Sequence, residues 1–249
     1  MPRYDFRTPR IYVDAALHSG AGLALGVHQR HYLRNVLRLK TGEEVLVFNG
    51  REGEWRAILE PAGKHAVSLL IGERTRAQAA ALDLHYIFAP LKHARLDYMV
   101  QKAVELGASR LQPVLTRYSQ VARVNVERMK ANTIEAAEQC GILSLPEVAS
   151  PVTFEAMIEA REATRLLIFC DEDAAVTDPI AALMLQRVSA PRPVAVLVGP
   201  EGGFAEHERS TLLGLPNVIR VSLGPRILRA DTAAVAALAL VGAVLGDWR

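Results

Sequence analysis

The sequence predicts an α/β protein in two parts: a small β-barrel at the N-terminus and then a parallel sheet flanked by helices. Three observations predict it. Short alternating or apolar runs, separated by turn residues, fill residues 1–72. From Leu82 onward, apolar runs alternate with stretches of helical periodicity. The later apolar runs are continuous, as expected for strands that are covered on both faces of a sheet.

The barrel is predicted from four runs with strand character, punctuated by Gly42, Asn49-Gly50, Pro61 and Gly63. These are Arg10–Ala15, Glu43–Gly50, Glu54–Glu60 and Ala66–Glu73. One helical segment, His28–Leu39, interrupts them, and Tyr32, Val36 and Leu39 are expected to face inward. Arg30, Arg34 and Arg38 would then lie four residues apart on one outward face. A solvated helix face explains the same pattern without any partner.

Residues 73–81 are the expected linker, and the second part follows with strands and helices in alternation. The expected strands are Leu82–Pro90, Arg110–Leu115, Arg165–Cys170, Pro193–Gly199 and Asn217–Leu223. The expected helices are Ala94–Gly107, Asn125–Gly141, Pro179–Val188, Glu206–Gly214 and Thr232–Gly246. A parallel sheet built this way binds ligands at the carboxyl ends of its strands.

Composition and charge limit the classes of function that the chain can have. The chain is 50% hydrophobic and 22% charged, which is ordinary for a globular protein, and its net charge is +2. The positive charge is local: residues 1–72 carry 10 Lys and Arg against 7 Asp and Glu, and residues 92–130 carry 8 against 3. Such patches suit a polyanionic partner.

The remaining composition argues against several classes of protein. The two cysteines, Cys140 and Cys170, form no CxxC pattern, which argues against a disulfide framework or a zinc site and favours a reducing, cytoplasmic setting. The histidines have no ligand spacing, so no metal is expected. The start of the chain has no apolar signal segment. The longest apolar run, Thr232–Gly246, is too short to span a bilayer.

The stretch VAVLVGPEGGF, Val194–Phe204, runs a buried strand into a glycine-rich turn. It is no P-loop, because Phe204 stands where a lysine might follow, and GxxGG is not the Rossmann GxGxxG. A structural turn without a ligand is one interpretation. Ala205 is a poor N-cap for the helix that follows, so we expect another group to hold the start of that helix.

A second strand also ends in a glycine turn, in VSLGPRILRADTAA, Val221–Ala234. Its loop carries Arg226 and Arg229, and Asp231-Thr232 opens the C-terminal helix, where an ordinary N-cap would account for both residues. Two such turns at neighbouring strand ends could wrap one flat, mostly uncharged ligand through backbone contacts. An adenosine-type group fits that description better than a bare phosphate.

These motifs carry a resemblance to a known family. In the second part of the chain the motifs are GPEGGF, LGPRILRADTA, KHARLDYMVQKAVELG and EAAEQCG with LPEV. Near the N-terminus they are MPR, HYLRNVLR, Gly42 and VFNG. Together they resemble the bacterial 16S ribosomal RNA (uracil-N3)-methyltransferases. These are S-adenosylmethionine-dependent enzymes of the SPOUT superfamily. The resemblance implies a PUA-like or OB-like RNA-binding barrel over residues 1–72. It also implies a SPOUT α/β domain over residues 73–249, with a C-terminal trefoil knot and a homodimer interface beside the cofactor pocket.

The resemblance implies a cofactor site, and the chemistry and spacing of other residues predict catalytic and RNA contacts beside it. Three loops would hold S-adenosylmethionine, with contacts from Phe169, Gly199, Pro200, Glu201, Gly202, Gly203, Leu223, Gly224, Ile227 and Leu228. Arg229 would stabilise the imide anion of uracil, and Asp231 would orient that arginine or accept the N3 proton. Alternatively, Asp231 caps its helix and Arg229 pairs with it. The RNA of the 30S subunit would meet Arg30, His31, Arg34, Arg38, Lys92 and Arg95.

The sequence departs from the family pattern at three informative positions. Ile142 and Tyr118 stand where arginine is common, and Asp231 stands where glutamate is more frequent. Two other functions remain open: a related SPOUT methyltransferase for another RNA position or base, and a non-catalytic RNA-binding factor of ribosome assembly. A nucleotide hydrolase is disfavoured because the phosphate-loop lysine is missing.

Overall fold

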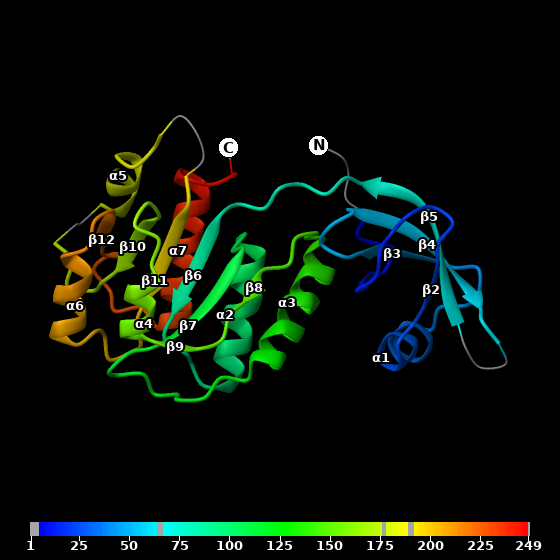
Figure 1. Ribbon diagram of the computed structural model, residues 1–249, viewed down its shortest axis with the longest axis horizontal. Coiled ribbons are helices and arrows are strands. Elements are labelled where there is room, and N and C mark those ends of the chain that lie inside the picture. Colours follow the sequence, from blue (N-terminus) through cyan, green and yellow to red (C-terminus); the bar gives the residue numbers. More distant parts are fainter. Residues whose placement is uncertain (1–4, 64–66, 176–177, 189–191, 249) are drawn as a thin grey trace. The chain divides into compact units, whose positions relative to one another are not determined.

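The computed structural model describes residues 5–63, 67–175, 178–188 and 192–248, so the MPR motif lies outside the described residues (Figure 1). The chain divides into two compact units. Unit 1 comprises residues 1–80 with 137–145, and unit 2 comprises residues 81–136 with 146–249. The sequence placed the boundary between residues 72 and 73. The structure extends the first unit to residue 80 and adds a segment from the middle of the chain.

Unit 1 is built on a curled five-stranded sheet in the order β1-β3-β4-β5-β2. The strands are β1 (Arg10–Tyr12), β2 (Gly22–Ala24), β3 (Glu44–Phe48), β4 (Glu54–Pro61) and β5 (Val67–Arg76). β1 pairs in parallel with β3 and the other pairs are antiparallel. Four of these strands were expected. β2 was not, because three residues of Gly-Leu-Ala give no alternating pattern.

The helical segment of unit 1 differs from the expectation in which face is buried. It consists of α1 (Val27–His31) and a π-helical turn, η1 (Tyr32–Val36). Leu33 is fully buried and Leu39 packs half-buried against the core, whereas Tyr32 and Val36 are exposed, so the expected inward set was right for Leu39 and wrong for the other two. A π-helical turn has more than the usual 3.6 residues, which rotates the side chains away from a simple four-residue stripe. Arg38 has left the helix and adopts a positive φ of 59°.

A buried ion triad fastens the last turn of α3 (Val126–Cys140) within unit 1. Glu54 is 3% exposed and accepts hydrogen bonds from Arg10 Nε at 2.6 Å and from Arg76 Nε at 2.9 Å. Arg10 also donates to the carbonyl of Glu138 at 3.3 Å, and Arg76 donates to that of Gly141 at 2.9 Å. These bonds explain why residues 137–145 belong to unit 1.

Unit 2 contains the parallel sheet that the sequence predicts. Its order is β12-β10-β11-β6-β7-β8, and every pair is parallel. The strands are β6 (Leu84–Phe88), β7 (Arg110–Leu115), β8 (Glu147–Val148), β10 (Leu166–Cys170), β11 (Val194–Val198) and β12 (Val218–Val221), with β9 (Val152–Thr153) on β7. The central strands β10 and β11 are buried along their whole length, because helices cover both faces.

Helices cover each face of this sheet and form two apolar cores. α2 (His93–Glu105), α3, α5 (Pro179–Met184) and α7 (Ala230–Val244) contribute to one core, around Tyr86 and Leu238. α4 (Phe154–Glu159) and α6 (Glu206–Leu213) contribute to the other, around Phe169. α4 was not expected from the sequence. No helix among the described residues is long and apolar enough to cross a membrane. The trefoil knot stays a prediction.

Candidate active site

A cleft of about 710 Å³ opens at the carboxyl ends of β10, β11 and β12, where the parallel sheet predicts a ligand site. Three loops line it, one after each strand. The loop after β10 contributes Cys170, Asp171, Glu172 and Ala174. The glycine turn after β11 contributes residues 198–204, and the loop after β12 contributes residues 222–228, with Ala230 and Ala233 of α7 behind them.

The glycine turn is held in one conformation by its own backbone and by a ring packed against it. The amide of Gly203 donates to the carbonyl of Pro200 at 2.9 Å, and Gly203 has a positive φ of 70°. A Cβ on Gly199 would lie 2.4 Å from the ring of Phe204, so only glycine fits there. Phe204 meets Phe169 edge-on, with ring centroids 5.0 Å apart. The turn therefore rests on the core of the domain.

Glu208 is the group that holds the start of α6, as the poor N-cap at Ala205 led us to expect. This glutamate is 1% exposed. Its Oε2 accepts from the amide of Ala205 at 2.9 Å, and its Oε1 accepts from the amide of Arg117 at 2.8 Å. Glu208 thus fixes the segment that leaves the glycine turn to the segment that follows β7.

The cleft contains the residues expected to bind a cofactor, with one exception. Every one of them lines it except Phe169, whose side chain is fully buried in the core below. Successive residues of a strand point to opposite faces, and Phe169 points to the face covered by α4 and α6. The wall at β10 consists instead of Cys170, Asp171 and Glu172. Sequence reasoning missed Glu172, although its place directly after a buried strand could have indicated it.

Carboxylates dominate the charged lining of the cleft, and they differ in how far they are paired. Asp171 is buried and accepts from Arg220 at 2.6 Å and from Arg209 at 3.1 Å. Glu172 lies 3.7 Å from Arg209 and is half exposed. Burial raises the pKa of the neighbouring Cys170 thiol to about 12, so this cysteine stays a neutral lining group. No lysine is present among the described residues that line the cleft.

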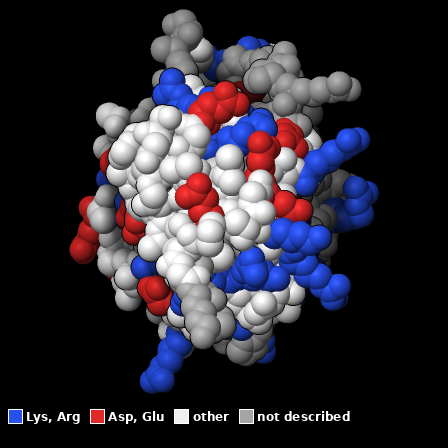
Figure 2. All heavy atoms as spheres, turned by 90° about the vertical axis from the view of Figure 1, so that its right-hand side faces the viewer, with Lys and Arg blue, Asp and Glu red and all other residues white. Residues whose placement is uncertain are grey.

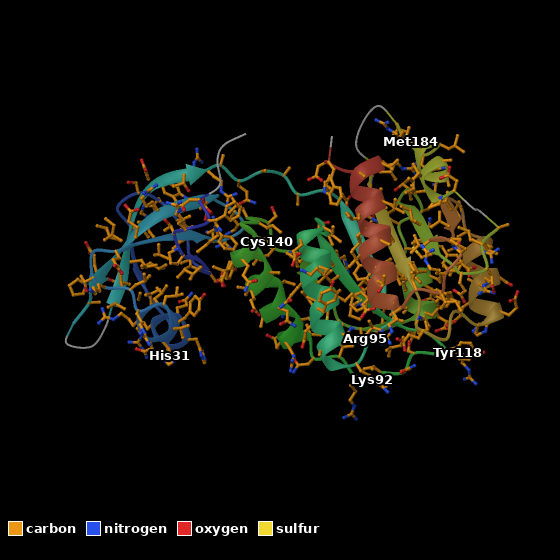
Figure 3. All side chains as sticks on the ribbon, turned by 180° about the vertical axis from the view of Figure 1, so that it is seen from behind. His31, Lys92, Arg95, Tyr118, Cys140 and Met184 are labelled. Atoms are coloured by element: carbon orange, nitrogen blue, oxygen red, sulfur yellow. The ribbon has the colours of Figure 1, made fainter. Side chains whose placement is uncertain are left out.

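Arg95, Glu201 and Asp231 meet beside the cleft. Arg95 lies in the first turn of α2, where its Nε donates to Asp231 Oδ2 at 3.0 Å and its Nη1 donates to Glu201 Oε1. Burial acts to raise the pKa of Asp231, but the hydrogen bonds from Arg95 and from the amide of Thr232 outweigh it, so the pKa lies below its ordinary value. Asp231 is therefore ionised at neutral pH. In Figure 3, Arg95 lies near the lower end of α7, and Lys92 projects from the same end of unit 2.

Arg229 and Asp231 do not pair with each other in the way the alternative interpretation required. α7 begins at Ala230 with Arg229 as its N-cap, and Arg229 makes no capping bond. Asp231 therefore sits inside the first turn rather than at the cap, because the helix starts earlier than its Asp-Thr signal indicates. The exposed side chain of Arg229 makes no hydrogen bond or ion pair with any described residue. It remains available to a ligand.

The residues predicted to contact RNA lie in both units. In unit 1, His31, Arg34 and Arg38 are exposed and Arg30 is half-buried. Figure 2 shows basic side chains gathered over the lower half of the face of unit 1 that is turned to the viewer. In unit 2, Lys92 is exposed, whereas Arg95 is engaged by two carboxylates.

Two departures from the family pattern now have a place in the structure. Tyr118 is half exposed, and its Cβ lies 3.3 Å from where a Cβ on Gly202 would be, so it lies against the glycine turn. Ile142 follows α3 in unit 1, where its amide donates to the carbonyl of Ala137 at 3.0 Å. The first therefore borders the cleft, and the second extends the end of a helix.

Comparison with known families covers most of the chain. Residues 78–242 match the model of an RNA methyltransferase domain, and residues 25–72 match that of an RNA methyltransferase PUA domain. A ribosomal RNA small subunit methyltransferase E from Rickettsia conorii is 31% identical over 233 residues, which cover 93% of this chain and 94% of that protein. A relative of the same name from Synechocystis is 32% identical over 228 residues, which cover 90% of this chain and 74% of that protein.

Solved structures agree with these relatives over nearly the whole chain. A ribosomal RNA small subunit methyltransferase E from Neisseria gonorrhoeae, bound to S-adenosyl methionine, has a TM-score of 0.85 at 28% identity, covering 98% of this chain and 100% of that one. A methyltransferase from Legionella pneumophila in complex with the cofactor SAM has a TM-score of 0.83 at 30% identity. The match covers 97% of this chain and 99% of that one.

Proposed function

The chain belongs to the ribosomal RNA small subunit methyltransferase E family, and from that premise we propose that it transfers a methyl group from S-adenosylmethionine to uracil N3 in 16S rRNA. The observation that carries the proposal is the cleft at the ends of β10, β11 and β12, lined by nine of the ten residues expected to bind the cofactor. The PUA-like unit 1 supports an RNA substrate.

The residues of the cleft fit S-adenosylmethionine. Gly199 and Gly203 occupy positions that a Cβ would crowd, which allows a ligand to approach the backbone closely. Leu223, Ile227 and Leu228 offer apolar contacts for an adenine ring. Glu172 and Glu201 add negative charge that suits a sulfonium and repels a phosphate. When bound there, the cofactor supplies an electrophilic methyl group.

Arg229 and Asp231 are assigned to the acceptor base. Uracil N3 carries a proton at neutral pH, so transfer requires that the N–H bond is lost as the new N–C bond forms. Arg229, which is exposed at the start of α7, stabilises the negative charge that develops on the uracil ring. The lowered pKa of Asp231 makes it a weak base, so its role is to orient neighbouring groups and the proton passes to water.

Methylation of 30S subunits tests these assignments. The Arg229→Ala variant is expected to lose about 100-fold in kcat, as for removal of one charge-stabilising donor, and Asp231→Asn is expected to lose about 10-fold or more. Calorimetry should find cofactor affinity within about 3-fold of wild type, because neither side chain lines the cleft. Near wild-type rates in both variants would rule out these roles.

Mass spectrometry of the product separates the remaining alternatives. A methyl group on uracil N3 of 16S rRNA supports the proposal, whereas one on another base or RNA identifies a related SPOUT methyltransferase. A protein that binds 30S subunits but neither binds S-adenosylmethionine nor transfers methyl is an assembly factor. The nine-residue match in the cleft argues against the assembly factor, and the family membership favours the first outcome over the second.

We assign RNA binding to the basic side chains of unit 1 and to Lys92. Phosphate contacts give an affinity that falls as salt rises, with a logarithmic slope of about −0.9 per contact in duplex DNA and about −0.7 for single strands. Arg34→Gln and Lys92→Gln should each reduce this slope by about one contact and weaken binding uniformly across RNA sequences. A filter-binding titration between about 50 and 200 mM salt measures it. Binding that hardly changed with salt would contradict this assignment.

A homodimer in the cytoplasm is part of the same proposal. Unit 2 exposes large apolar side chains on and after α5, namely Ile180, Met184 and Leu185, the last 84% exposed (Met184 is labelled in Figure 3). On the rim of the cleft, Ile227 is 94% exposed. Exposed apolar side chains of this size favour burial against a partner. Sedimentation velocity measures the oligomeric state, and a monomer at micromolar concentration would refute the dimer.

A further inference from the structure

We propose that Arg95 is a positioning residue of the methyl-transfer site: it holds the glycine turn, through Glu201, against the start of α7, through Asp231. The proposal rests on the proposed function and deepens it, because it assigns Arg95 to the active site instead of to RNA phosphate. Three features of unit 2 lead to it.

The first feature is the pairing itself. Arg95 donates from Nε to Asp231 at 3.0 Å and from Nη1 to Glu201, which come from two different segments of the domain. Glu201 lines the cleft, and Asp231 follows Ala230, which also lines it. A planar guanidinium presents its donors to two carboxylates in fixed directions at once, whereas an ammonium group is a compact charge with rotatable donors. Arg95 thus links two walls of the cleft from behind.

The second feature is that Arg95 lies at a helix position where a positive charge is unfavourable. It lies in the first turn of α2, where the helix dipole favours acidic side chains, and α2 has no acidic residue in that turn. Asp231, in contrast, lies in the first turn of α7, where the dipole favours it. A cation placed against the dipole at the start of a helix, and compensated only by distant carboxylates, is typical of a functional site.

The third feature is that the guanidinium group of Arg95 has few accessible donors left for RNA phosphate. One third of the Arg95 side chain is exposed, and its Nη2 is buried with no hydrogen-bond partner among the described residues. Lys92, one turn earlier, is exposed and projects from the same end of unit 2 (Figure 3). Lys92 is therefore the better phosphate contact, because the guanidinium of Arg95 is engaged by Asp231 and Glu201.

Steady-state methylation of 30S subunits by Arg95→Gln separates positioning from RNA binding. Because a misplacement of about 1 Å can cost 100-fold in rate, we expect kcat to fall by about 10- to 100-fold. The KM for RNA and the salt slope should stay within about 2-fold of wild type. Arg95→Lys, which keeps the positive charge but loses the planar arrangement of donors, should give an intermediate kcat. An unchanged kcat with a raised KM and a salt slope smaller by about one contact would overturn the proposal.

Two further measurements show whether Arg95 acts through Glu201. In a double-mutant cycle, the variant that carries both Arg95→Gln and Glu201→Gln should have a kcat within about 2-fold of that of the slower single variant. A loss in kcat equal to the product of the two single losses would overturn the proposal. Arg128→Gln is the matched control. It removes an ion pair between Arg128 of α3 and Asp97 of α2 that lies outside the cleft lining, and its kcat should match wild type within about 2-fold.

Hydrogen exchange tests the proposal independently of activity. Without any substrate, amides of residues 199–205 should exchange about 10-fold faster in Arg95→Gln than in wild type, because the turn loses its support. The Arg128→Gln protein should show wild-type exchange there. If wild type neither binds S-adenosylmethionine nor methylates RNA, the proposed function fails while the exchange data still decide the role of Arg95. Unchanged exchange in Arg95→Gln would overturn the inference.

Discussion

The Glu54→Gln variant is expected to lower the free energy of unfolding by about 3–5 kcal/mol, the typical cost of breaking a buried ion pair. Glu54 is 3% exposed and lies between Arg10 and Arg76, which are themselves 4% and 15% exposed. A glutamine would remove the negative charge that the two guanidinium groups share in the interior of unit 1. Urea denaturation, followed by the fluorescence of Trp55 in β4, measures the change.

An exposed pair in the same sheet provides the control for Glu54. Glu44 and Arg56 also form a salt bridge, at 2.6 Å, but their side chains are 44% and 38% exposed. Glu44→Gln should therefore cost between 0 and about 1 kcal/mol. Equal losses for the two variants would show that burial does not set the strength of the triad.

The pH dependence of this difference follows from the pKa of Glu54. Burial acts to raise this pKa, but hydrogen bonds from Arg76, Arg10 and Thr75 outweigh it, so the pKa lies below its ordinary value of 4.5. The stability that Glu54 contributes is thus fully present above about pH 4.5 and is lost as the pH falls through the lowered folded value. The gap between wild type and Glu54→Gln should shrink in that acidic range.

The Gly199→Ala variant is expected to lose at least about 10-fold in affinity for S-adenosylmethionine. Its Cβ would lie 2.4 Å from the ring of Phe204, which is 6% exposed and packed against Phe169. Relieving such overpacking typically costs about 1–3 kcal/mol, and here it displaces the glycine turn or the ring beneath it. Because a 10-fold change in affinity corresponds to about 1.4 kcal/mol, calorimetry resolves the loss.

A second glycine of unit 2 controls for the substitution itself. Gly214, after α6, has an ordinary φ of −79°, and a Cβ there would lie 3.5 Å from the carbonyl of Thr211. Gly214→Ala should leave cofactor affinity unchanged and stability equal or slightly higher. Wild-type affinity in Gly199→Ala would mean that the turn can move without disturbing the cleft.

Local patterns in the sequence predict much of unit 2. Continuous apolar runs predicted β10 and β11, and helical periodicity over Ala94–Gly107 predicted α2, which Gly107 ends with a φ of 85°. The glycine turn, and the need for a group other than Ala205 to hold α6, could also be inferred. These features depend on neighbouring residues and on the burial of both sheet faces, which a sequence displays directly.

What the sequence could not predict depends on partners far away along the chain. Arg95 lies 106 residues before Glu201 and 136 before Asp231, so nothing local distinguishes it from a phosphate-binding arginine. The triad around Glu54 likewise joins segments of unit 1 that are distant in sequence. The π-helical turn at Tyr32–Val36 changed the inward face, because periodicity analysis assumes 3.6 residues per turn.

The acidic lining of the cleft has a consequence for competition inside a cell. Nucleotides share the adenosine group that the cleft is suited to hold, and a backbone cradle alone would accept them too. Asp171, Glu172 and Glu201 line the walls together with Arg226, but Asp171 is paired with Arg220 and Arg209, and Glu201 is paired with Arg95. Glu172, which is half exposed and 3.7 Å from Arg209, is the least compensated of the three. A polyphosphate chain that approaches Glu172 meets like charge, and rejection of the wrong ligand is part of specificity. We therefore expect Glu172 to disfavour adenine nucleotides at the wall that would hold a cationic cofactor.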